Sequence, residues 1–324
     1  MNVESKNGKL LQKNDMPLPK KKRKLFRKKD IPLYIMALPT IVWLILFCYL
    51  PMSGLVLAFE KYKVSDGIFR SQFIGLKNFE YLFTTTDAWV ITRNTILYNI
   101  AFILLNLVLS VLIALILNEL RSKHAGKAFQ TVYMMPYFLS WAVVSILLTA
   151  FLDYDNGFIN KIFQMMGETG KTDWYKVKEI WPPLLIFINA WKGVGYQTVL
   201  FIAVISGIPN DYYEAAVIDG ATRFQQAWYI TLPQLRMIIA ISLIMSFGNI
   251  FRGDFGLFYT VTKNSGALYP VTDVIDTYIY RGLINLGNTG MSAAAGLYQS
   301  VVGFIAILVA NKVVSKVDPD SAMF

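Results

Sequence analysis

The chain has 324 residues, of which 55% are hydrophobic and 16% are charged, and its formal net charge is +10. A soluble domain carries roughly 25% charged residues, so this composition excludes an ordinary soluble enzyme. Several apolar stretches reach the roughly 20 residues that cross a bilayer, which predicts an all-α, multi-pass membrane protein. The single cysteine, Cys48, excludes a disulfide within the chain, and the single histidine, His124, excludes a catalytic His pair or a multi-His metal site.

Residues 1–30 are predicted to form a basic, partly disordered cytoplasmic tail. Much of the positive charge lies in "KKKRKLFRKK", Lys20–Lys29, behind a polar stretch typical of disorder. Such a run could bind nucleic acid. However, the apolar segment Ile31–Phe59 follows directly, which favours an anchor attracted to anionic lipid that fixes the orientation of the chain. This segment is too long for a signal-peptide core and has no small-residue cleavage site, so we expect it to be retained.

Six apolar segments predict six transmembrane helices within a domain of residues 31–320. The segments are Leu33–Phe59, Thr95–Leu117, Val132–Phe151, Trp181–Ile205, Leu235–Phe251 and Ser292–Val314. Lys and Arg gather in the tail, in the 121–127 connection and at the C-terminal end, which six spans place on one side. Because Lys and Arg favour the cytoplasm, we expect both termini and residues 206–234 inside the cell. Three loops of mixed charge are expected outside, near residues 60–94, 152–180 and 252–291.

Polar and small residues within these segments predict contacts between helices. Asn99 and Asn106 lie seven residues apart and share a helical face, which favours hydrogen bonds between helices over a solute site. Gly193 and Gly195 would either loosen the fourth helix or let a neighbour approach closely. The run Ser292–Gly296, "SAAAG", predicts close packing of the last helix.

The fourth segment and the end of the fifth contain candidate residues for a solute pathway. Lys192 stands about 16 Å from Trp181 along the helix axis, close to mid-bilayer. A buried cation there must pair, face water or extend towards the surface. The candidates are Asn189, Trp191, Lys192, Tyr196, Gln197 and Asn249. They either line a pathway or form hydrogen bonds and an ion pair between helices, and the sequence leaves both interpretations open.

The polar loop between the fourth and fifth segments predicts two short helices around a tight turn. Asn210 is a suitable N-cap for the first helix, and Gly220 is a suitable C′ residue because it is free to take a positive φ. Thr222 and Gln225 fit a capping box for the second helix. Leu232-Pro233 is expected to end that helix and open the fifth span.

The first helix of this loop looks like a docking element rather than a catalytic one. Tyr212, Ala215 and Ala216 fall on one face of the helix. The side chains of the two alanines are small, so another surface can approach this face closely. Tyr212 and Tyr213 supply large, stiff side chains that lose little entropy on docking. The alternative is an amphipathic connector lying on the membrane surface.

The spacing of this loop resembles a known signature. Glu214-Ala215-Ala216, then Gly220, then nine residues and Ile230-x-Leu232-Pro233 resemble the "EAA" motif of permease subunits of bacterial ABC importers. Three further stretches resemble the carbohydrate branch of that family, particularly its oligosaccharide-type permeases: "FGLFYTVT" (Phe255–Thr262), "TYIY" (Thr277–Tyr280) and "SAAAG". The likeness covers roughly residues 30–320. The branch often has Gly-Gly-Pro after the "VT", and here the sequence is "KNSGALYP".

The resemblance implies a type I ABC importer permease fold whose loop 207–234 holds a coupling helix that docks into a cleft on a cytoplasmic ATPase. Glu214 would pair with a basic group of that ATPase, and Gly220 would make the bend. The implied coupling residues are Tyr212, Tyr213, Glu214, Ala215, Ala216, Asp219, Gly220 and Ala221. Arg252 and Asp254 would either contact an extracellular binding protein or form a solvated edge, and the edge is favoured.

The resemblance also implies the partners of the chain. They are a second homologous permease forming a heterodimer, a cytoplasmic ABC ATPase dimer, an extracellular solute-binding protein or lipoprotein, a carbohydrate expected to be an oligosaccharide, and membrane lipid. Nucleic acid is not expected. The implied location is the bacterial cytoplasmic membrane.

No energy source is expected within the chain itself. "GETGKT", Gly167–Thr172, contains Gly-Lys-Thr, but a P-loop needs glycine where Met165 stands, and the segment lies on the predicted outer side. ATP and Mg²⁺ are therefore expected on the partner ATPase, with no cofactor, metal or catalytic residue in this chain. Enzyme motifs such as H-E-x-x-H and G-x-S-x-G are absent. Two alternatives stay open: the same machinery carrying a non-sugar solute, and a stand-alone channel or ion-coupled carrier.

Overall fold

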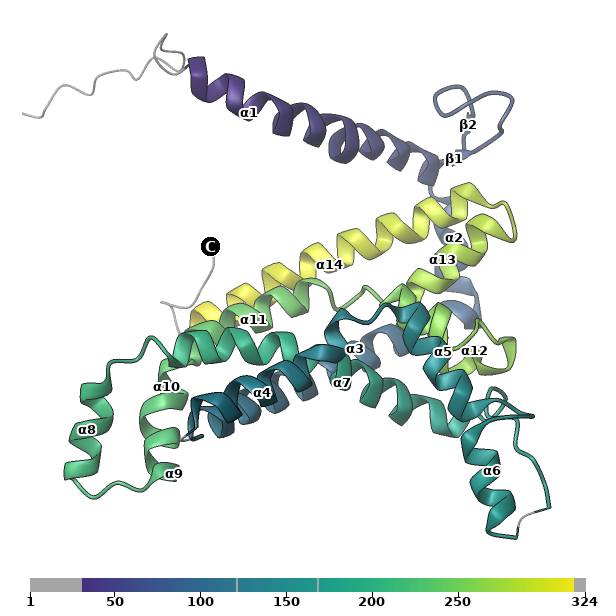
Figure 1. Cartoon of the computed structure of the whole chain (residues 1–324). Coiled ribbons are helices and arrows are strands. Elements are labelled where there is room, and N and C mark those ends of the chain that lie inside the picture. Colours follow the sequence, from purple (N-terminus) through teal and green to yellow (C-terminus); the bar gives the residue numbers. More distant parts are fainter. Residues whose placement is uncertain (1–30, 121, 168, 318–324) are drawn as a thin grey trace, which may run out of the picture. The chain divides into compact units, whose positions relative to one another are not determined.

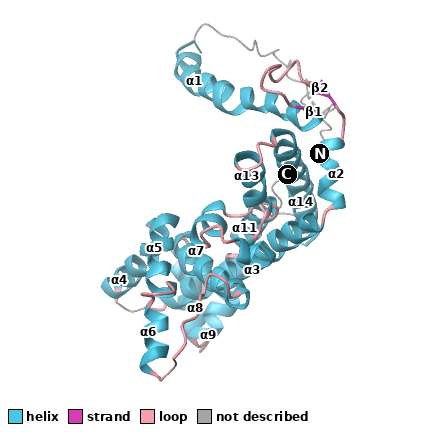
Figure 2. Cartoon of the chain, turned by 90° about the vertical axis from the view of Figure 1, so that its right-hand side faces the viewer, coloured by secondary structure: helices cyan, strands magenta, loops and turns pink. Residues whose placement is uncertain are grey.

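The computed structural model describes residues 31–120, 122–167 and 169–317. It separates into two units, residues 1–53 and 54–324, and each is described by itself. The basic run Lys20–Lys29 and the predicted disordered tail lie outside the described residues. Helices and loops make up nearly all of the chain drawn in Figure 2, in keeping with the all-α prediction, and the described residues contain one two-stranded sheet.

The first unit contains helix α1 (Ile31–Leu44) and the π-helical segment η2 (Ile45–Tyr49), which leads into the 3₁₀ segment η3 (Leu50–Phe59). In the π turn the Leu50 N–H donates to the Ile45 carbonyl, one residue further back than in an α-helix. Pro51 follows at once. Proline lacks an N–H and its ring crowds the carbonyl four residues earlier, so a widened turn before it lets the helix continue.

The second unit is built from helices of very different lengths. Its α-helices are α2 (Lys77–Thr84), α3 (Thr86–Asn118), α4 (Lys123–Met134), α5 (Trp141–Leu152), α6 (Phe158–Met165), α7 (Trp181–Ile205), α8 (Asn210–Ile218), α9 (Arg223–Gln226), α10 (Leu232–Gln234), α11 (Arg236–Gly248), α12 (Tyr269–Thr272), α13 (Ile275–Ile284) and α14 (Thr289–Val317). Its 3₁₀ and π segments are η4 (Met135–Phe138), η5 (Lys178–Ile180), η6 (Ala227–Thr231), η7 (Gly256–Val261) and η8 (Gly266–Leu268). Strands β1 (Glu60–Lys61) and β2 (Gln72–Phe73) pair antiparallel.

Helices α3 and α7 form the centre of the second unit. One buried cluster joins them to α5 and η7, with the Tyr98 and Phe258 rings 4.9 Å apart and Trp181 fully buried. A second cluster joins α3 and α7 to the start of α11 through Phe201 and Leu235. Helices α11 and α14 lie side by side (Figure 1). The two long helices α3 and α7 therefore pack against each other, and α5, η7 and the start of α11 pack on them.

Two predicted packing motifs are confirmed. A Cβ atom on Gly195 would lie 2.4 Å from the Tyr133 carbonyl oxygen, so only glycine permits the close approach of α4 to α7. Ala294 and Ala295 are fully buried, and the Ser292 hydroxyl donates to the Ile279 carbonyl of α13 at 3.1 Å. The "SAAAG" run thus serves close packing between helices.

The spans agree with the sequence prediction in part. Among the described residues, four helices are long and apolar enough to cross a membrane, or up to six if each of two bent helix pairs counts as one span. The fourth predicted segment, Trp181–Ile205, is confirmed with the same bounds. Helix α3 begins at Thr86, nine residues before the predicted Thr95, because the Thr85 hydroxyl caps it by accepting from the Ala88 N–H.

The third predicted segment is not one helix. The helical stretch through η4 and helix α5 meet at 94°. Leu139 is extended, with φ −72° and ψ 133°, and the Ser140 hydroxyl accepts from the Val143 N–H as the N-cap of α5. Pro136 lies in the first turn of the 3₁₀ segment η4, just before this break. A proline, an extended residue and a new cap therefore end one helix and start another, and the prediction of a continuous Val132–Phe151 helix was wrong.

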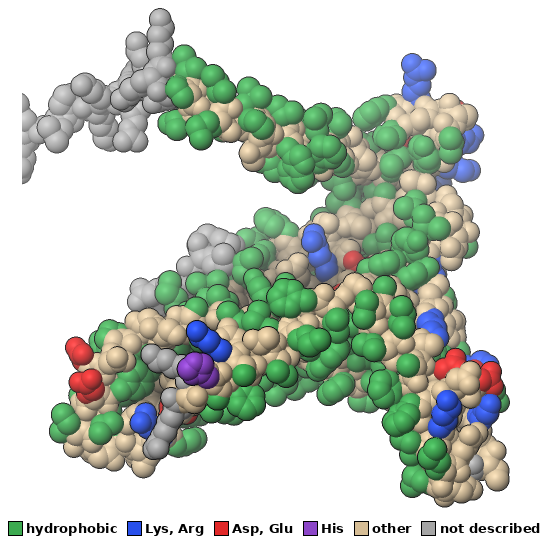
Figure 3. All heavy atoms as spheres, in the orientation of Figure 1, with side chains coloured by type: hydrophobic (Ala, Val, Ile, Leu, Met, Phe, Trp, Pro, Cys, Tyr) green, Lys and Arg blue, Asp and Glu red, His purple; other side chains and the backbone are tan. Residues whose placement is uncertain are grey.

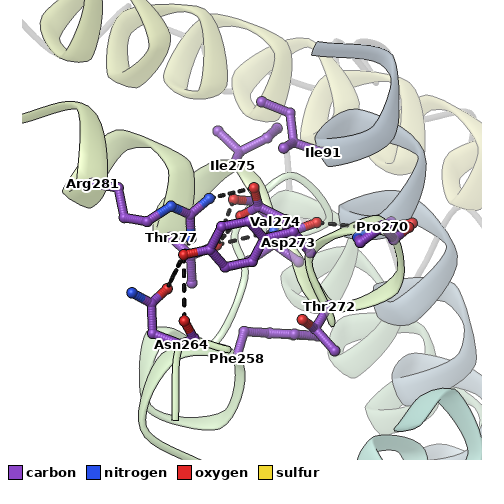
Figure 4. Close-up of polar contacts among 12 residues, drawn as sticks. Ile91, Phe258, Asn264, Pro270, Thr272, Asp273, Val274, Ile275, Thr277 and Arg281 are labelled. Carbon is purple, nitrogen blue, oxygen red and sulfur yellow. Dashed lines mark hydrogen bonds and ion pairs between the residues drawn. The ribbon is translucent and has the colours of Figure 1, made fainter. Parts of the chain in front are cut away.

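A buried polar network anchors the segment between η7 and α13 (Figure 4). Arg281 forms an ion pair with Asp273, and both side chains are about nine-tenths buried. The Arg281 guanidinium also donates to Asn264 Oδ1 at 3.1 Å. Asn264 and Lys263 have positive φ values, 46° and 55°, which non-glycine residues rarely adopt. The bond from Arg281 helps to hold this uncommon backbone turn in place.

Candidate functional site

A cavity of about 420 Å³ opens between α3, α7, α11 and the turn that follows α11. Its apolar wall includes Phe102, Ile103 and Leu107. Its polar wall carries five amides, two hydroxyls and two ions, which are Asn99, Asn106, Asn189, Gln197, Asn249, Ser242, Ser246, Arg252 and Asp254. In the middle of the face drawn in Figure 3, charged side chains are sparse among hydrophobic and uncharged groups. Most of the polar groups in the cavity wall are uncharged.

Two of these amides also hold the helices together. The Asn99 amide donates to the carbonyls of Ile250 and Arg252 at 3.0 Å each, which ties α3 to the turn after α11. The Asn106 amide donates to Asn189 Oδ1 at 2.8 Å, which ties α3 to α7. The predicted role in helix contacts is confirmed. Their place on the cavity wall was not predicted, although their shared face was a signal for it.

The two ions of the cavity wall differ in how they are satisfied. Asp254 accepts from Trp141 Nε1 at 3.0 Å and from the Leu257 N–H at 3.2 Å. The side chain of Arg252 is exposed and makes no hydrogen bond or ion pair with any residue that the structure describes. A solvated outer edge was the favoured prediction for Arg252 and Asp254. Both residues are exposed, as that prediction requires, and both also line the cavity.

Three predicted pathway residues lie outside this cavity. Lys192 donates to the Tyr137 carbonyl at 2.6 Å and sits 5.4 Å and 5.2 Å from the ring centres of Tyr137 and Trp141. The ring of Tyr196 stacks on Tyr137 at 4.9 Å. Trp191 is 40% exposed. A carbonyl and two ring faces offset the cost of the cation, so the geometry of Lys192 matches the packing interpretation. Asn189, Gln197 and Asn249 are the predicted residues that do line the cavity.

The polar loop forms the predicted helix–turn–helix. The Ala221 N–H donates to the Ala216 carbonyl at 2.8 Å, and the Gly220 N–H donates to the Val217 carbonyl at 3.1 Å. Gly220 has φ 79°. These two bonds and the left-handed glycine are the Schellman end of α8. Thr222 and Gln225 form the predicted capping box, so both turn signals read from the sequence are confirmed.

Two boundaries of the loop differ from prediction. Pro209 stands at the N-cap of α8 with an extended backbone, so Asn210 is the first helical residue and its side chain does not cap the helix. The second helix does not end at Leu232-Pro233. It continues through η6 and α10 to Gln234, and the 56° bend to α11 comes at Leu235. The π turn before Pro233 accommodates the ring, as η2 does before Pro51.

The surface of α8 is acidic, and a side-chain contact joins this helix to η6. Residues 206–222 contain Asp211, Glu214 and Asp219 and no Lys or Arg, and all three carboxylates are exposed. Acidic side chains appear at the α8 end of the second unit (Figure 3). Tyr213 is half-buried, and its hydroxyl lies 2.9 Å from Thr231 Oγ1. The residue expected to dock on a partner therefore connects α8 to η6 inside the loop.

The second helix of the loop is connected to the centre of the unit. Arg223 Nη1 of α9 lies 3.7 Å from Glu119 Oε2 at the end of α3. The loop is also continuous with α7 on one side and α11 on the other. Together with the Tyr213–Thr231 contact, these links connect α8 to three helices that line the cavity.

Comparisons with known proteins agree with this architecture. Residues 106–319 match the family described as "binding-protein-dependent transport system inner membrane component". The chain is 34% identical to the polygalacturonan/rhamnogalacturonan transport system permease protein YteP of Bacillus subtilis (strain 168), over 92% of each chain. It is also 34% identical to Protein LplB of the same organism, over 90% of this chain and 91% of LplB.

A solved structure has the same fold. A chain in the crystal structure of a bacterial ABC transporter involved in the import of the acidic polysaccharide alginate superposes with a TM-score of 0.80. It is 32% identical, and the match covers 90% of this chain and 97% of that one. A further structure, of a bacterial alginate ABC transporter in complex with an alginate pentasaccharide-bound periplasmic protein, matches with the same TM-score and identity. The chain thus belongs to the inner-membrane components of binding-protein-dependent transport systems, as a multi-pass permease subunit of an ABC importer in the cytoplasmic membrane.

Proposed function

We propose that this chain is the permease subunit of an ATP-driven, binding-protein-dependent importer whose solute is a carbohydrate, an oligosaccharide. The relatives of the chain support this class, since they include a polygalacturonan/rhamnogalacturonan permease and an alginate importer. The observation that carries the proposal is the wall of the cavity, where uncharged polar groups face the open space.

The hydrogen-bonding capacity of this wall suits hydroxyl groups. The side chains of Gln197, Ser242 and Ser246 have no hydrogen-bond partner among the residues described here. Asn189 uses its carbonyl oxygen towards Asn106 and keeps its amide donors. Asn249 donates to the Met245 carbonyl and keeps its own oxygen. Amides and hydroxyls offer both donors and acceptors, and a sugar hydroxyl both donates and accepts. The cavity therefore offers the pattern that a hydroxyl-rich solute needs.

In this proposal the loop 207–234 receives mechanical work from a cytoplasmic ABC ATPase dimer, which binds ATP and Mg²⁺. The cytoplasmic membrane surface is anionic and repels an acidic helix, so the three exposed carboxylates of α8 favour a basic protein partner over a membrane-surface connector. Most of the implied coupling residues are exposed on α8 and its turn: Tyr212, Glu214, Ala215, Asp219 and Gly220. Ala216 and Ala221 are half-buried. Docking would move α8, the η6 segment that Tyr213 contacts, and the attached helices as one rigid body.

The remaining partners complete the importer. An extracellular solute-binding protein would deliver the oligosaccharide, in keeping with the family description and with the pentasaccharide-bound periplasmic protein of the alginate neighbour. A second homologous permease would form the other half of a heterodimer. Six spans, cytoplasmic termini and a lipid-facing outer surface belong to the same proposal.

The cavity variants test the proposal with matched controls. Gln197→Ala or Asn249→Ala should each remove one hydrogen bond to the solute, which costs about 0.5–1.5 kcal/mol, or two- to tenfold in apparent affinity. The measurement is ATPase stimulation of the purified complex by binding protein loaded with a panel of oligosaccharides, peptides and lipid-linked solutes. Trp191→Ala, outside the cavity, should change stimulation less than twofold. Stimulation by a non-sugar solute alone, or equal losses in all three variants, would count against the proposal.

A further inference from the structure

We infer that the transported oligosaccharide is acidic and that Arg252 binds its carboxylate groups inside the cavity. This inference rests on the proposed carbohydrate function and adds the chemical class of the sugar. One of the charged side chains around the cavity has no hydrogen-bonded partner in the described protein, and a neutral sugar would not supply an anion for it.

Three of the four ions near the cavity are engaged with the protein. Asp254 accepts from an indole and a backbone N–H. Asp276 accepts from the Gly253 N–H and from the Gln299 amide. Lys192 donates to a carbonyl and lies over two aromatic rings. Each of these charges is therefore held by at least two groups of the chain itself.

Arg252 is the fourth ion, and its guanidinium has no such hydrogen bond within the described part of the chain. It lines the 420 Å³ cavity and also a neighbouring cavity of about 270 Å³ between α11 and α14. Arg252 attracts the Asp276 carboxylate from beyond ion-pair distance, but that carboxylate is already hydrogen-bonded to Gly253 and Gln299. A cation without a hydrogen-bonded anion is costly within a membrane protein unless it faces water or meets an anion. Its position on the walls of two cavities gives it access to a solute from both.

The backbone that carries Arg252 is fixed, although its side chain is unbound. The Arg252 N–H donates to the Asn249 carbonyl at 2.9 Å, and the Arg252 carbonyl accepts from the Asn99 amide at 3.0 Å. A guanidinium fork presents parallel N–H donors that match the two oxygens of a carboxylate. The neighbouring amides and serines remain available for sugar hydroxyls. A uronate residue, with one carboxylate and several hydroxyls on one ring, satisfies both sets of groups.

The alternative is that Arg252 only extends into water. In that case neutral and acidic oligosaccharides would pass equally well, and the loss of the charge would affect both alike. Arg252 would also tolerate replacement by any hydrophilic side chain. The two interpretations therefore differ in solute selectivity, which can be measured without identifying the natural solute.

The test uses the complete importer in proteoliposomes, with binding protein at saturating concentration so that capture does not set the rate. The probes are tetramers of galacturonate and of alginate, their fully methyl-esterified forms, and maltotetraose. Esterification removes the charge and keeps the ring. The parent complex should import at least one acidic tetramer faster than its ester. Arg252→Gln should lower acidic uptake about ten- to a hundredfold and leave ester uptake within about twofold. Arg252→Lys should retain part of the acidic uptake.

The possible failures are distinguishable. Equal uptake of acids and esters by the parent complex, import of maltotetraose alone, or an equal loss of both forms in Arg252→Gln would overturn the acidic assignment and leave carbohydrate import standing. Failure to import any of the five probes, with ATPase activity intact, would count against the carbohydrate function as well. Co-purification of the ATPase with the Arg252→Gln complex controls for misassembly.

Discussion

At the scale of single residues, some polar side chains of α7 face the cavity and others contact Tyr137 of η4. At about 100° per residue, Lys192, Tyr196, Asn189 and Gln197 span one arc of about 140° on the helix. One side of that arc meets Asn106 and the cavity, and the other meets Tyr137. Helical periodicity predicts this arc, but it does not predict which of the four side chains face the cavity and which face Tyr137. Tyr137 lies in η4, next to a break in the third segment that the sequence did not predict.

Lys192 is expected to stabilise the fold rather than touch the solute. In Lys192→Met the Tyr137 carbonyl loses a charged donor, a bond worth about 1–3 kcal/mol. The thermal stability of the purified complex should therefore fall. Solute-stimulated ATPase activity should stay within about twofold of the parent value, because the Nζ atom lies outside the cavity wall. A stable variant that has lost stimulation would instead place Lys192 in the pathway.

At the scale of elements, short-range signals predicted local turns well and long helices less well. The Gly220 turn and the Thr222–Gln225 capping box depend on neighbouring residues, and both were predictable. The ends of helices near prolines were not, because a π turn lets a helix continue where the ring would otherwise stop it. Pro233 shows this, since η6 carries the helix past it to Gln234.

The turn between α8 and α9 is the element most open to a direct test of coupling. In Gly220→Pro the ring fixes φ near −65° where the turn needs +79°, and it removes the N–H that donates to Val217. We expect uptake to fall at least tenfold, which corresponds to about 1.4 kcal/mol in docking of the ATPase. Solute capture by the binding protein should be unchanged.

Gly207→Ala is the matched control in the same loop. Its φ is not positive, and its Cβ would meet only the Val204 carbonyl at 3.4 Å, an ordinary contact. Uptake and ATPase co-purification should therefore be normal in this variant. Normal uptake in Gly220→Pro would argue against coupling through the loop, since the turn could not keep its conformation.

At the scale of the whole molecule, composition and charge predicted the class of protein, and the spaced "EAA" pattern predicted the family. Four long helices and two bent pairs are compatible with six spans, although the two bends at Leu139 and Leu235 depend on tertiary packing that one sequence does not reveal. The cavity likewise depended on residues from three helices. Asn99 and Ser246 could not be brought together without knowing how α3 and α11 pack.

The central claim is that this permease performs no transport work of its own. The most direct measurement is oligosaccharide accumulation in liposomes that contain this chain and its permease partner, with the binding protein, in the presence and absence of the ATPase subunit. The account predicts accumulation against a gradient only when both the ATPase and Mg-ATP are present. Accumulation against a gradient without the ATPase, driven by an ion gradient or by the chain alone, would contradict it.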